Sequence, residues 1–228
     1  TWQQQFMLNI NSAYFSKLGD DELSDKMLKF MSDNRVDTSH VKKVSGSTIG
    51  LYLISLVNGE RTFSYWRNNS AATLLGQNIN DVEHAVKKQD MIYFSGITLA
   101  ILDPSSRNNL FSCLKSARCA GKKIAFDPNL RPKLWSDKKE MCDVIMAGAN
   151  LSDIILPSFD DESTWFSDAN PMATLKRYQK VGAEIVVVKN AGEPVSFISN
   201  QGIGTHPVQS IGTIVDRGYA NISSNSLS

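Results

Sequence analysis

The sequence predicts an α/β protein built on a mostly parallel β-sheet. From residue 91 onward, short apolar runs rich in β-branched and aromatic residues alternate with longer amphipathic runs, which is the pattern of βαβ units. The apolar runs are continuous, as expected of strands covered on both faces. An Asn-Gly pair between two β-rich runs adds an antiparallel hairpin to this plan.

The individual elements follow from these patterns. Strands are expected at residues 91–96, 123–126, 153–156 and 184–188. Helices are expected at residues 104–120, 136–149 and 171–181. The first of these helices begins at Pro104 and is followed by Gly121, which are the preferred residues for the two ends of a helix. Residues 194–200 and 203–209 are expected to form a second hairpin at a sheet edge.

The first hairpin covers residues 48–67, with Asn58-Gly59 at its turn, and is expected to project from the body as a flap. Strand alternation places Tyr65 and Arg67 on one face, and Tyr52 is expected to lie across from them. Two phenols and a guanidinium can bind a polar ligand that bears a carboxylate. An ordinary packing face with a surface arginine is the alternative.

Residues 124–135 form an apolar strand that runs into polar side chains held between two prolines. Each proline fixes its own φ and biases the preceding residue toward extended geometry, so Asp127, Asn129 and Arg131 are expected to project from a stiff turn. Ligands of open α/β sheets bind at the carboxyl ends of strands, where this turn lies. A polar turn that caps the next helix is the alternative.

Other motifs are less specific. Residues 189–194 form a tight turn after a buried strand, and such a turn either binds a nucleotide through its N–H groups or simply connects two strands. The acidic run at residues 160–162 fits a helix N-terminus, with a metal or nucleotide role as the alternative. His40, His84 and His206 are scattered in the sequence and are expected to be structural or solvent-facing.

Composition points to a cytoplasmic globular protein. Lys and Arg number 24 against 23 Asp and Glu, so the chain has no general attraction for nucleic acid or an anionic membrane. Cys113, Cys119 and Cys142 lack CxxC spacing and are expected to be reduced core thiols, without a metal. No signal sequence and no apolar run of about 18 residues is present. The chain begins with Thr, which suggests a fragment.

Three motifs together are more specific than any one of them: Gly50–Tyr52, Glu60–Arg67 and Phe126–Trp135. They resemble the 2-keto-3-deoxygluconate kinases of the ribokinase-like (PfkB) sugar kinases, and the similarity covers residues 11–216. The resemblance implies a ribokinase-like three-layer α/β/α sandwich with a mostly parallel sheet and a β-hairpin lid. It also implies transfer of the ATP γ-phosphoryl group to the 6-hydroxyl of 2-keto-3-deoxygluconate, with Mg²⁺ following from the ATP chemistry.

The resemblance also implies the binding residues. The sugar acid is expected to bind to Tyr52, Tyr65, Arg67 and Arg131. The nucleotide is expected to bind to Asn129, Arg131, Ser158, Lys189, Asn190 and Gly192. A sugar with a carboxylate needs guanidinium partners, whereas a neutral ketose such as fructose, the alternative substrate, does not. Lids in this family often meet in dimers, so a homodimer through the lid is a further expectation.

The sequence departs from the family in two places. The expected organisation is one partial kinase domain over residues 1–228, with the lid at 48–67 and a disordered tail at 217–228. The family's first sugar-binding loop is missing. Residues 215–221 read Val-Asp-Arg-Gly-Tyr-Ala-Asn where the family has Asp-Thr-Thr-Ala-Ala-Gly-Asp, so Asp216 matches only the first Asp. No catalytic residue is therefore assigned.

Without the proton acceptor and the glycine-rich anion hole, phosphoryl transfer loses most of its catalytic apparatus. The chain is therefore expected to be an impaired kinase from a truncated or altered reading frame, or from a shortened protein. A non-catalytic remnant or binding module is the alternative from another functional class.

Overall fold

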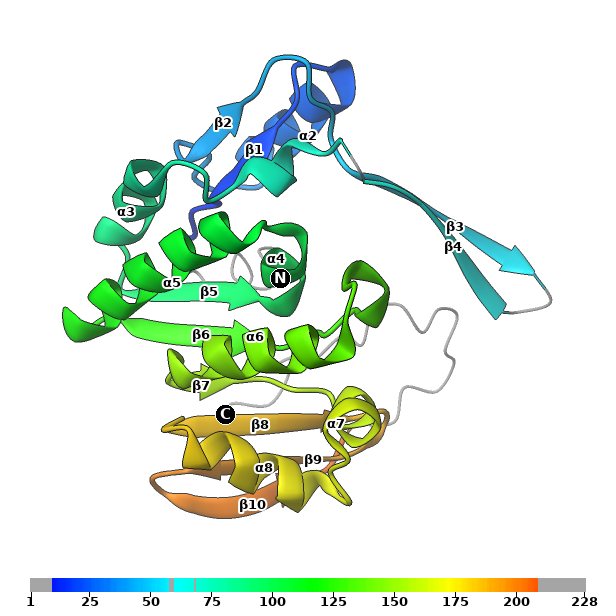
Figure 1. The fold of residues 1–228 in the computed structure, drawn as a ribbon, viewed down its shortest axis with the longest axis vertical. Helices are drawn as coiled ribbons and strands as arrows, with labels where there is room; N and C mark the ends of the chain where they lie inside the picture. Colours follow the sequence, from blue (N-terminus) through cyan, green and yellow to red (C-terminus); the bar gives the residue numbers. More distant parts are fainter. Residues whose placement is uncertain (1–9, 58–59, 68, 209–228) are drawn as a thin grey trace.

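The computed structural model describes residues 10–57, 60–67 and 69–208. Its main sheet has six strands in the order β10-β9-β8-β7-β6-β5 (Figure 1). The strands are β5 Met91–Ser95, β6 Lys123–Asp127, β7 Ile154–Ile155, β8 Ile185–Asn190, β9 Glu193–Ser199 and β10 Gly202–His206. Strands β5 to β8 are parallel, and β9 and β10 add an antiparallel hairpin at the edge, as the sequence predicts.

The helices that follow the strands begin and end at residues suited to those positions. They are α4 Gly96–Ile101, α5 Pro104–Cys119, α6 Lys138–Asn150, α7 Phe159–Phe166 and α8 Pro171–Lys180, with a short 3₁₀ helix, η2, at Pro132–Leu134. The Asp103 side chain accepts the backbone N–H of Ser106 at the start of α5. Gly121 follows α5 with a φ of +84°, a conformation that glycine adopts easily. The predicted helices are confirmed to within two residues.

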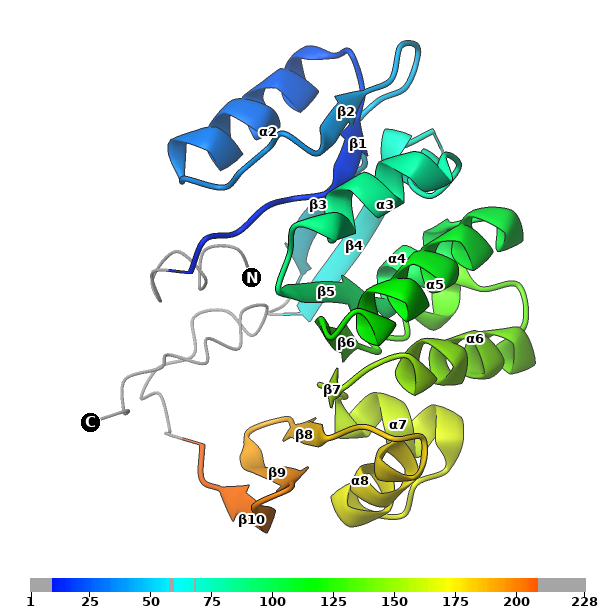
Figure 2. The same ribbon diagram turned by 90° about the vertical axis from the view of Figure 1, so that its left-hand side faces the viewer.

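The strand order explains where these helices lie. Strands β5 to β8 are neighbours in the same order as in the sequence, and right-handed crossovers between such strands place every connecting helix on the same face. Figure 2 shows α5, α6, α7 and α8 on one side of the sheet. The main core lies between the sheet and these helices and includes Phe94, Ile124, Phe126, Ile155 and Val186.

The opposite face of the sheet is more open. Met91, Tyr93 and Ile185 project from it and are 52%, 55% and 37% exposed. The expectation that these strands are covered on both faces is therefore wrong for the described residues. An apolar run in the sequence predicts a strand, but it does not show whether other elements cover both faces of that strand. The predicted α/β fold with a mostly parallel sheet and an antiparallel edge hairpin is confirmed, and among the described residues α5 to α8 cover one face of that sheet.

A smaller unit precedes the main sheet. It contains two parallel strands, β1 Ser16–Leu18 and β2 Val41–Lys43, joined by α2 Glu22–Asp33. Leu18, Met31 and Val36 form its small core. The 3₁₀ helix η1 Ala71–Leu74 and the helix α3 Ile79–Lys87 then lead into β5.

The predicted flap is an antiparallel hairpin of β3 Leu51–Val57 and β4 Glu60–Trp66, which projects from the body (Figure 1). Its expected turn, Asn58-Gly59, lies outside the described residues, as does the expected disordered tail at 217–228. Leu51, Tyr52 and Trp66 are 43%, 53% and 59% exposed, so apolar side chains face solvent on both sides of the ribbon. The hairpin is confirmed, and its role as a lid stays a prediction.

A buried ionic cluster joins α7 to α8. The guanidinium of Arg177 donates to the carboxylates of Glu162, at 2.5 Å, and Asp168, at 2.7 Å. The hydroxyl of Tyr178 also donates to Glu162, at 3.0 Å. Glu162 and Tyr178 are fully buried. The acidic run does lie in the first turn of α7, as predicted, but Glu162 is a core partner of α8 as well.

Candidate functional site

The loop after β6 carries two of the predicted ligand-binding residues in an uncommon conformation. Asn129 has a φ of +30° and Arg131 a φ of +48°, both in the left-handed region. Between them, Leu130 is completely buried and anchors the loop in the core. Non-glycine residues with positive φ persist only where the surroundings hold them, and they cluster at functional sites.

The expectation of extended geometry before the second proline is wrong. Arg131 precedes Pro132 and has φ and ψ of 48° and 64°. The steric bias of an X-Pro pair is a local preference, and the burial of Leu130 outweighs it here. Gly96 contributes to the same region, because a Cβ at this position would lie 1.7 Å from the carbonyl oxygen of Pro128. The start of α4 and the loop therefore pack backbone against backbone.

A polar network connects three strands, β5, β6 and β8. The Asp127 carboxylate, at the end of β6, accepts the ammonium of Lys189 on β8 at 3.1 Å. It also accepts the hydroxyl of Tyr93 on β5 at 3.5 Å. Partial desolvation of the Tyr93 hydroxyl and the nearby Asp127 carboxylate raise the pKa of Tyr93. The network lies at the edge of the sheet where the sequence predicts a ligand site.

Asp161, in the first turn of α7, connects this helix to the loop. Its carboxylate accepts the backbone N–H of Leu130 and lies near the guanidinium of Arg131. Burial raises the pKa of Asp161, while Arg131 and the Leu130 N–H oppose that rise. Sequence reasoning missed Asp161 and Tyr93 as parts of this region. The acidic run and the strand pattern include these residues, but neither indicates that Asp161 lies near Arg131 or that Tyr93 contacts Asp127.

The predicted nucleotide residues lie along neighbouring strand ends. Ser158 at the start of α7 pairs with Lys189 in a short parallel bridge, and the Lys189 N–H donates to the carbonyl of Pro157 at 2.9 Å. Asn190 is the last residue of β8, and Ala191 and Gly192, with φ values of +32° and +95°, form the turn to β9. Through the contact between Lys189 and Asp127, this turn is connected to the loop that carries Asn129 and Arg131.

The backbone of the hairpin places three predicted sugar-acid residues close together, as the sequence predicts. Tyr52 and Tyr65 are direct cross-strand partners, and Arg67 lies two residues after Tyr65. The Arg67 guanidinium carbon is 5.8 Å from the centre of the Tyr52 ring, so these two side chains share a face. The side chain of Tyr65 lies outside the described residues.

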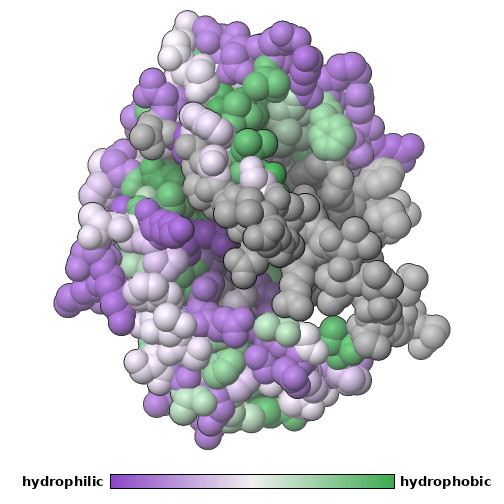
Figure 3. Space-filling model, turned by 90° about the vertical axis from the view of Figure 1, so that its right-hand side faces the viewer, coloured by the Kyte–Doolittle hydropathy of each residue, from purple (hydrophilic) through white to green (hydrophobic). Residues whose placement is uncertain are grey.

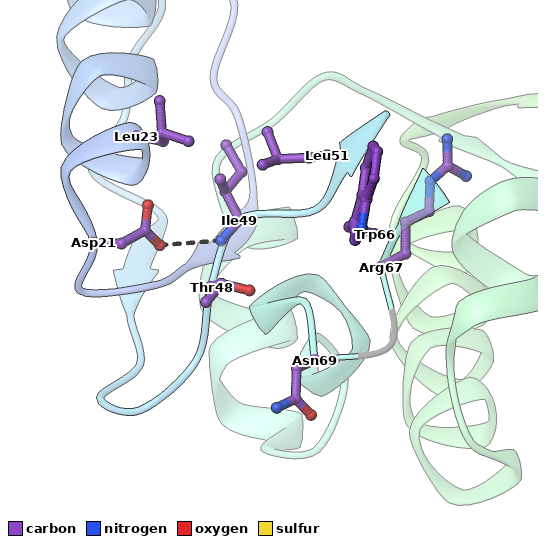
Figure 4. Close-up of a pocket in the computed structure, with 8 residues that line it drawn as sticks. All are labelled: Asp21, Leu23, Thr48, Ile49, Leu51, Trp66, Arg67 and Asn69. Atoms are coloured by element: carbon purple, nitrogen blue, oxygen red, sulfur yellow. Dashed lines mark hydrogen bonds between the residues drawn. The ribbon is translucent and has the colours of Figure 1, made fainter. Parts of the chain in front are cut away.

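A cavity of about 540 Å³ opens at the base of the hairpin (Figure 4). It is lined by Asp21, Leu23, Thr48, Ile49, Leu51, Trp66, Arg67 and Asn69. The Asp21 carboxylate accepts the N–H of Ile49 at 3.1 Å and thereby joins the start of α2 to the strand entering the hairpin. Figure 4 shows Trp66 on the side of Leu23 and Leu51, whereas the Arg67 guanidinium points the other way.

The expected convergence of Arg67 and Arg131 on one pocket stays a prediction. The cavity at the hairpin base contains Arg67 but no residue of the loop after β6. The hairpin and this loop lie at the same end of the molecule (Figure 1). Figure 3 looks onto that end and shows apolar surface in its upper half with hydrophilic surface around it.

Two of the scattered histidines lie together. The rings of His40 and His84 meet edge to face with their centres 5.5 Å apart, which their separation in the sequence did not indicate. Among the cysteines, Cys113 is buried, but Cys119 is exposed at the end of α5, so the expectation of a core thiol is wrong there. All three cysteines are free thiols.

Helices long and apolar enough to cross a membrane are not found within residues 10–57, 60–67 and 69–208.

Comparisons with known proteins identify the family. Residues 5–217 match the model of the "pfkB family carbohydrate kinase". The chain is 41% identical over 183 residues to the 2-dehydro-3-deoxygluconokinase of Haemophilus influenzae, covering 79% of this chain and 58% of that protein. It is 34% identical over 192 residues to the enzyme of the same name from Dickeya dadantii, covering 83% and 62%. The chain thus spans about three fifths of the length of these relatives.

Solved structures agree with this result. The crystal structure of a PfkB protein from Polaromonas sp. JS666 matches with a TM-score of 0.83 and 26% identity, covering 92% of this chain and 71% of that one. A putative ribokinase II from E. coli, in complex with ATP and Mg²⁺, matches with a TM-score of 0.77 and 21% identity, covering 92% and 67%. The second match supports the ribokinase-like fold. With a family match over most of its length, this chain belongs to the PfkB family of carbohydrate kinases.

Proposed function

We propose that this chain represents a kinase that transfers the γ-phosphoryl group of ATP to the 6-hydroxyl of 2-keto-3-deoxygluconate. The observation that carries the proposal is the arrangement of the hairpin, where the backbone of Tyr52 pairs with that of Tyr65 and the Arg67 guanidinium lies near the Tyr52 ring. Identity of 41% to a protein named 2-dehydro-3-deoxygluconokinase supports the same substrate.

The hairpin residues suit a sugar acid. The Arg67 guanidinium offers two parallel N–H donors to a carboxylate, and the phenols of Tyr52 and Tyr65 offer apolar rings with a polar end. Arg131, on the loop after β6, is the second proposed cation for the substrate and also meets the nucleotide. A homodimer through the hairpin belongs to the same proposal, because the ribbon exposes Leu51 and Trp66 on one side.

The proposed nucleotide site consists of Asn129, Arg131, Ser158, Lys189 and the turn at 190–192. These residues fit a phosphate-bearing ligand, because they follow β6, β7 and β8 at the same edge of the sheet and include cations and polar groups. The Ser158 side chain does not cap its own helix α7. The Lys189 ammonium forms an ion pair with Asp127, and this contact has to loosen before Lys189 can bind a phosphate. ATP supplies the phosphoryl group when it is bound.

The described residues are compatible with a Mg²⁺ ion that binds together with the nucleotide phosphates. No group of three His, Cys, Asp or Glu side chains suited to a metal ion occurs in the described part of the chain. Mg²⁺ usually binds through one or two carboxylates together with phosphates and water. Asp127 and Asp161 are the carboxylates available at this edge of the sheet.

We further propose that turnover is weak, because residues 216–221 read Asp-Arg-Gly-Tyr-Ala-Asn and lack the glycine-rich stretch with its proton acceptor. Calorimetry with 2-keto-3-deoxygluconate and with ATP and Mg²⁺, beside a phosphorylation assay of the Haemophilus influenzae relative, tests the function. Binding of both ligands with slow turnover is expected. Turnover within tenfold of the relative contradicts the impairment, and binding of neither ligand contradicts the proposed function.

Arg67→Ala is expected to weaken binding of 2-keto-3-deoxygluconate about 10- to 100-fold, since a hydrogen bond to a charged group is worth about 1.5–3 kcal/mol. Calorimetry measures the change. Fructose, which has no carboxylate, serves as the matched ligand, and its weaker binding should change little. Lys133→Ala removes an exposed cation near Arg131 and serves as the control variant. Equal losses for the two sugars would count against a sugar-acid site.

A further inference from the structure

Two side chains outside the proposed ligand contacts meet beneath the loop that carries Asn129 and Arg131. The indole N–H of Trp135 donates to the carbonyl of Leu130 at 2.8 Å. Leu130 is the buried residue between the two left-handed residues, so this bond is made at the centre of the strained segment. Two backbone bonds close the turn beyond it, from the Leu134 N–H to the Arg131 carbonyl and from the Trp135 N–H to the Pro132 carbonyl.

Arg107, on α5, holds Trp135 in place. Its guanidinium carbon is 5.0 Å from the centre of the Trp135 ring, which is the geometry of a cation–π contact. The guanidinium also donates to the carbonyls of Leu99, at 2.7 Å, and Leu102, at 2.9 Å, and to the Glu140 carboxylate at 2.6 Å. It therefore satisfies carbonyls at the end of α4 and joins α4, α5 and α6 around one aromatic ring.

Arg107 suits this position because of its shape. The planar guanidinium donates through several N–H groups in its plane while its face stacks on the indole. The side chain is only 12% exposed, and its Nε–H and Nη1–H groups donate to protein acceptors rather than to bulk water. A lysine offers a single ammonium without a flat face and cannot make the same set of contacts.

The geometry points to a positioning role: Arg107 and Trp135 hold the Pro128–Arg131 turn in its left-handed conformation and thereby place Asn129 and Arg131 for ligand binding. The placement of ligand-binding side chains rests on the proposed function, whereas the conformation of the turn does not. Neither residue has to touch the substrate. We call the contacts that Arg107 and Trp135 make the bracket. Loss of the bracket lets the turn relax toward the extended geometry that Pro132 favours in the preceding residue.

Two variants separate this role from general stability. Trp135→Phe keeps an aromatic ring for the guanidinium but removes the N–H donor to Leu130, and Arg107→Lys keeps the charge but removes the planar donor set. Trp165→Phe is the matched control, because it makes the same chemical change in α7, away from the indole bond to Leu130. Thermal unfolding of each variant checks that it is folded.

The test combines amide hydrogen exchange with calorimetry. In Trp135→Phe and Arg107→Lys, exchange in the peptide covering residues 129–135 is expected to speed up at least fivefold, and the affinity for 2-keto-3-deoxygluconate to fall about 5- to 20-fold. Trp165→Phe should change neither quantity. Unchanged exchange in both variants overturns the bracket. If the unmodified chain binds 2-keto-3-deoxygluconate and the variants exchange faster but bind it equally well, the bracket does not place Asn129 and Arg131 for ligand binding.

If the unmodified chain binds neither ligand while exchange still rises in both variants, the bracket is supported and the proposed function fails.

Discussion

Gly96→Ala is expected to destabilise the protein by about 3 kcal/mol, at the upper end of the range for overpacking. The new Cβ would lie 1.7 Å from the carbonyl oxygen of Pro128 and 2.8 Å from its carbonyl carbon. Backbone atoms cannot rotate away as a side chain can, so either α4 or the loop after β6 has to move. Because Asn129 and Arg131 lie within three residues of Pro128, ligand binding is expected to fall together with stability.

Urea denaturation of the unmodified chain and the variant measures the first effect, and calorimetry measures the second. Gly148→Ala is the control with a milder steric conflict. Its new Cβ would lie 3.1 Å from Leu99 Cδ1, the far end of a side chain that can adjust. A loss below about 1 kcal/mol is expected for the control. If Gly96→Ala proves no more harmful than Gly148→Ala, the close contact between α4 and the loop is not as described.

Glu162→Ala is expected to cost about 3 kcal/mol of the free energy of unfolding, because removing one partner of a buried ion pair leaves the other uncompensated. The guanidinium of Arg177 would retain Asp168, which keeps the loss at the lower end of the usual range. The buried hydroxyl of Tyr178 would lose its acceptor. Urea denaturation checks the value, and Glu193→Ala, at an exposed position on β9, is the matched control.

The same carboxyl predicts a pH dependence. Burial raises the pKa of Glu162 from 4.5 to about 7, against the opposing effect of Arg177. The folded state therefore binds a proton more tightly than the unfolded state. The resulting stabilisation is fully present below about pH 4.5 and is lost as the pH rises through about 7, up to roughly 3 kcal/mol at 1.36 kcal/mol per unit.

Glu162→Gln isolates this effect, because glutamine keeps the shape of the protonated acid and does not titrate. Denaturation at several pH values between 5 and 8 is expected to show stability falling with pH in the unmodified chain and falling less in Glu162→Gln. Parallel curves for the two proteins would mean that Glu162 does not titrate in this range.

Much of the fold could be predicted from the sequence, because the relevant signals are local. Pro104 and Gly121 mark the ends of α5, and an Asn-Gly pair in the sequence predicted the hairpin, whose strand register places Tyr52 opposite Tyr65. The conformation of Arg131 could not be predicted, since the local bias before Pro132 favours extended geometry. The exposed face of the sheet was also missed, because the same apolar residues suit a covered strand and an open one.

The candidate site was also predicted only in part from the sequence. The motif at residues 126–135 predicted the position of the loop, and the turn after β8 was predicted as a possible nucleotide-binding turn. The contact of Asp127 with Lys189 and the bond from Leu130 to Asp161 join segments that are far apart in the sequence. Such contacts depend on the register between strands and on the packing of α7, which residue patterns do not encode locally.

The sequential order of β5 to β8 has a consequence for how this protein is made. Each of these strands pairs with the one synthesised just before it, so every βα unit can dock as it leaves the ribosome, without waiting for a distant segment. Low sequence separation between contacting elements favours fast folding. The chain can therefore assemble its sheet in the order of translation, with the newest strand always forming the growing edge.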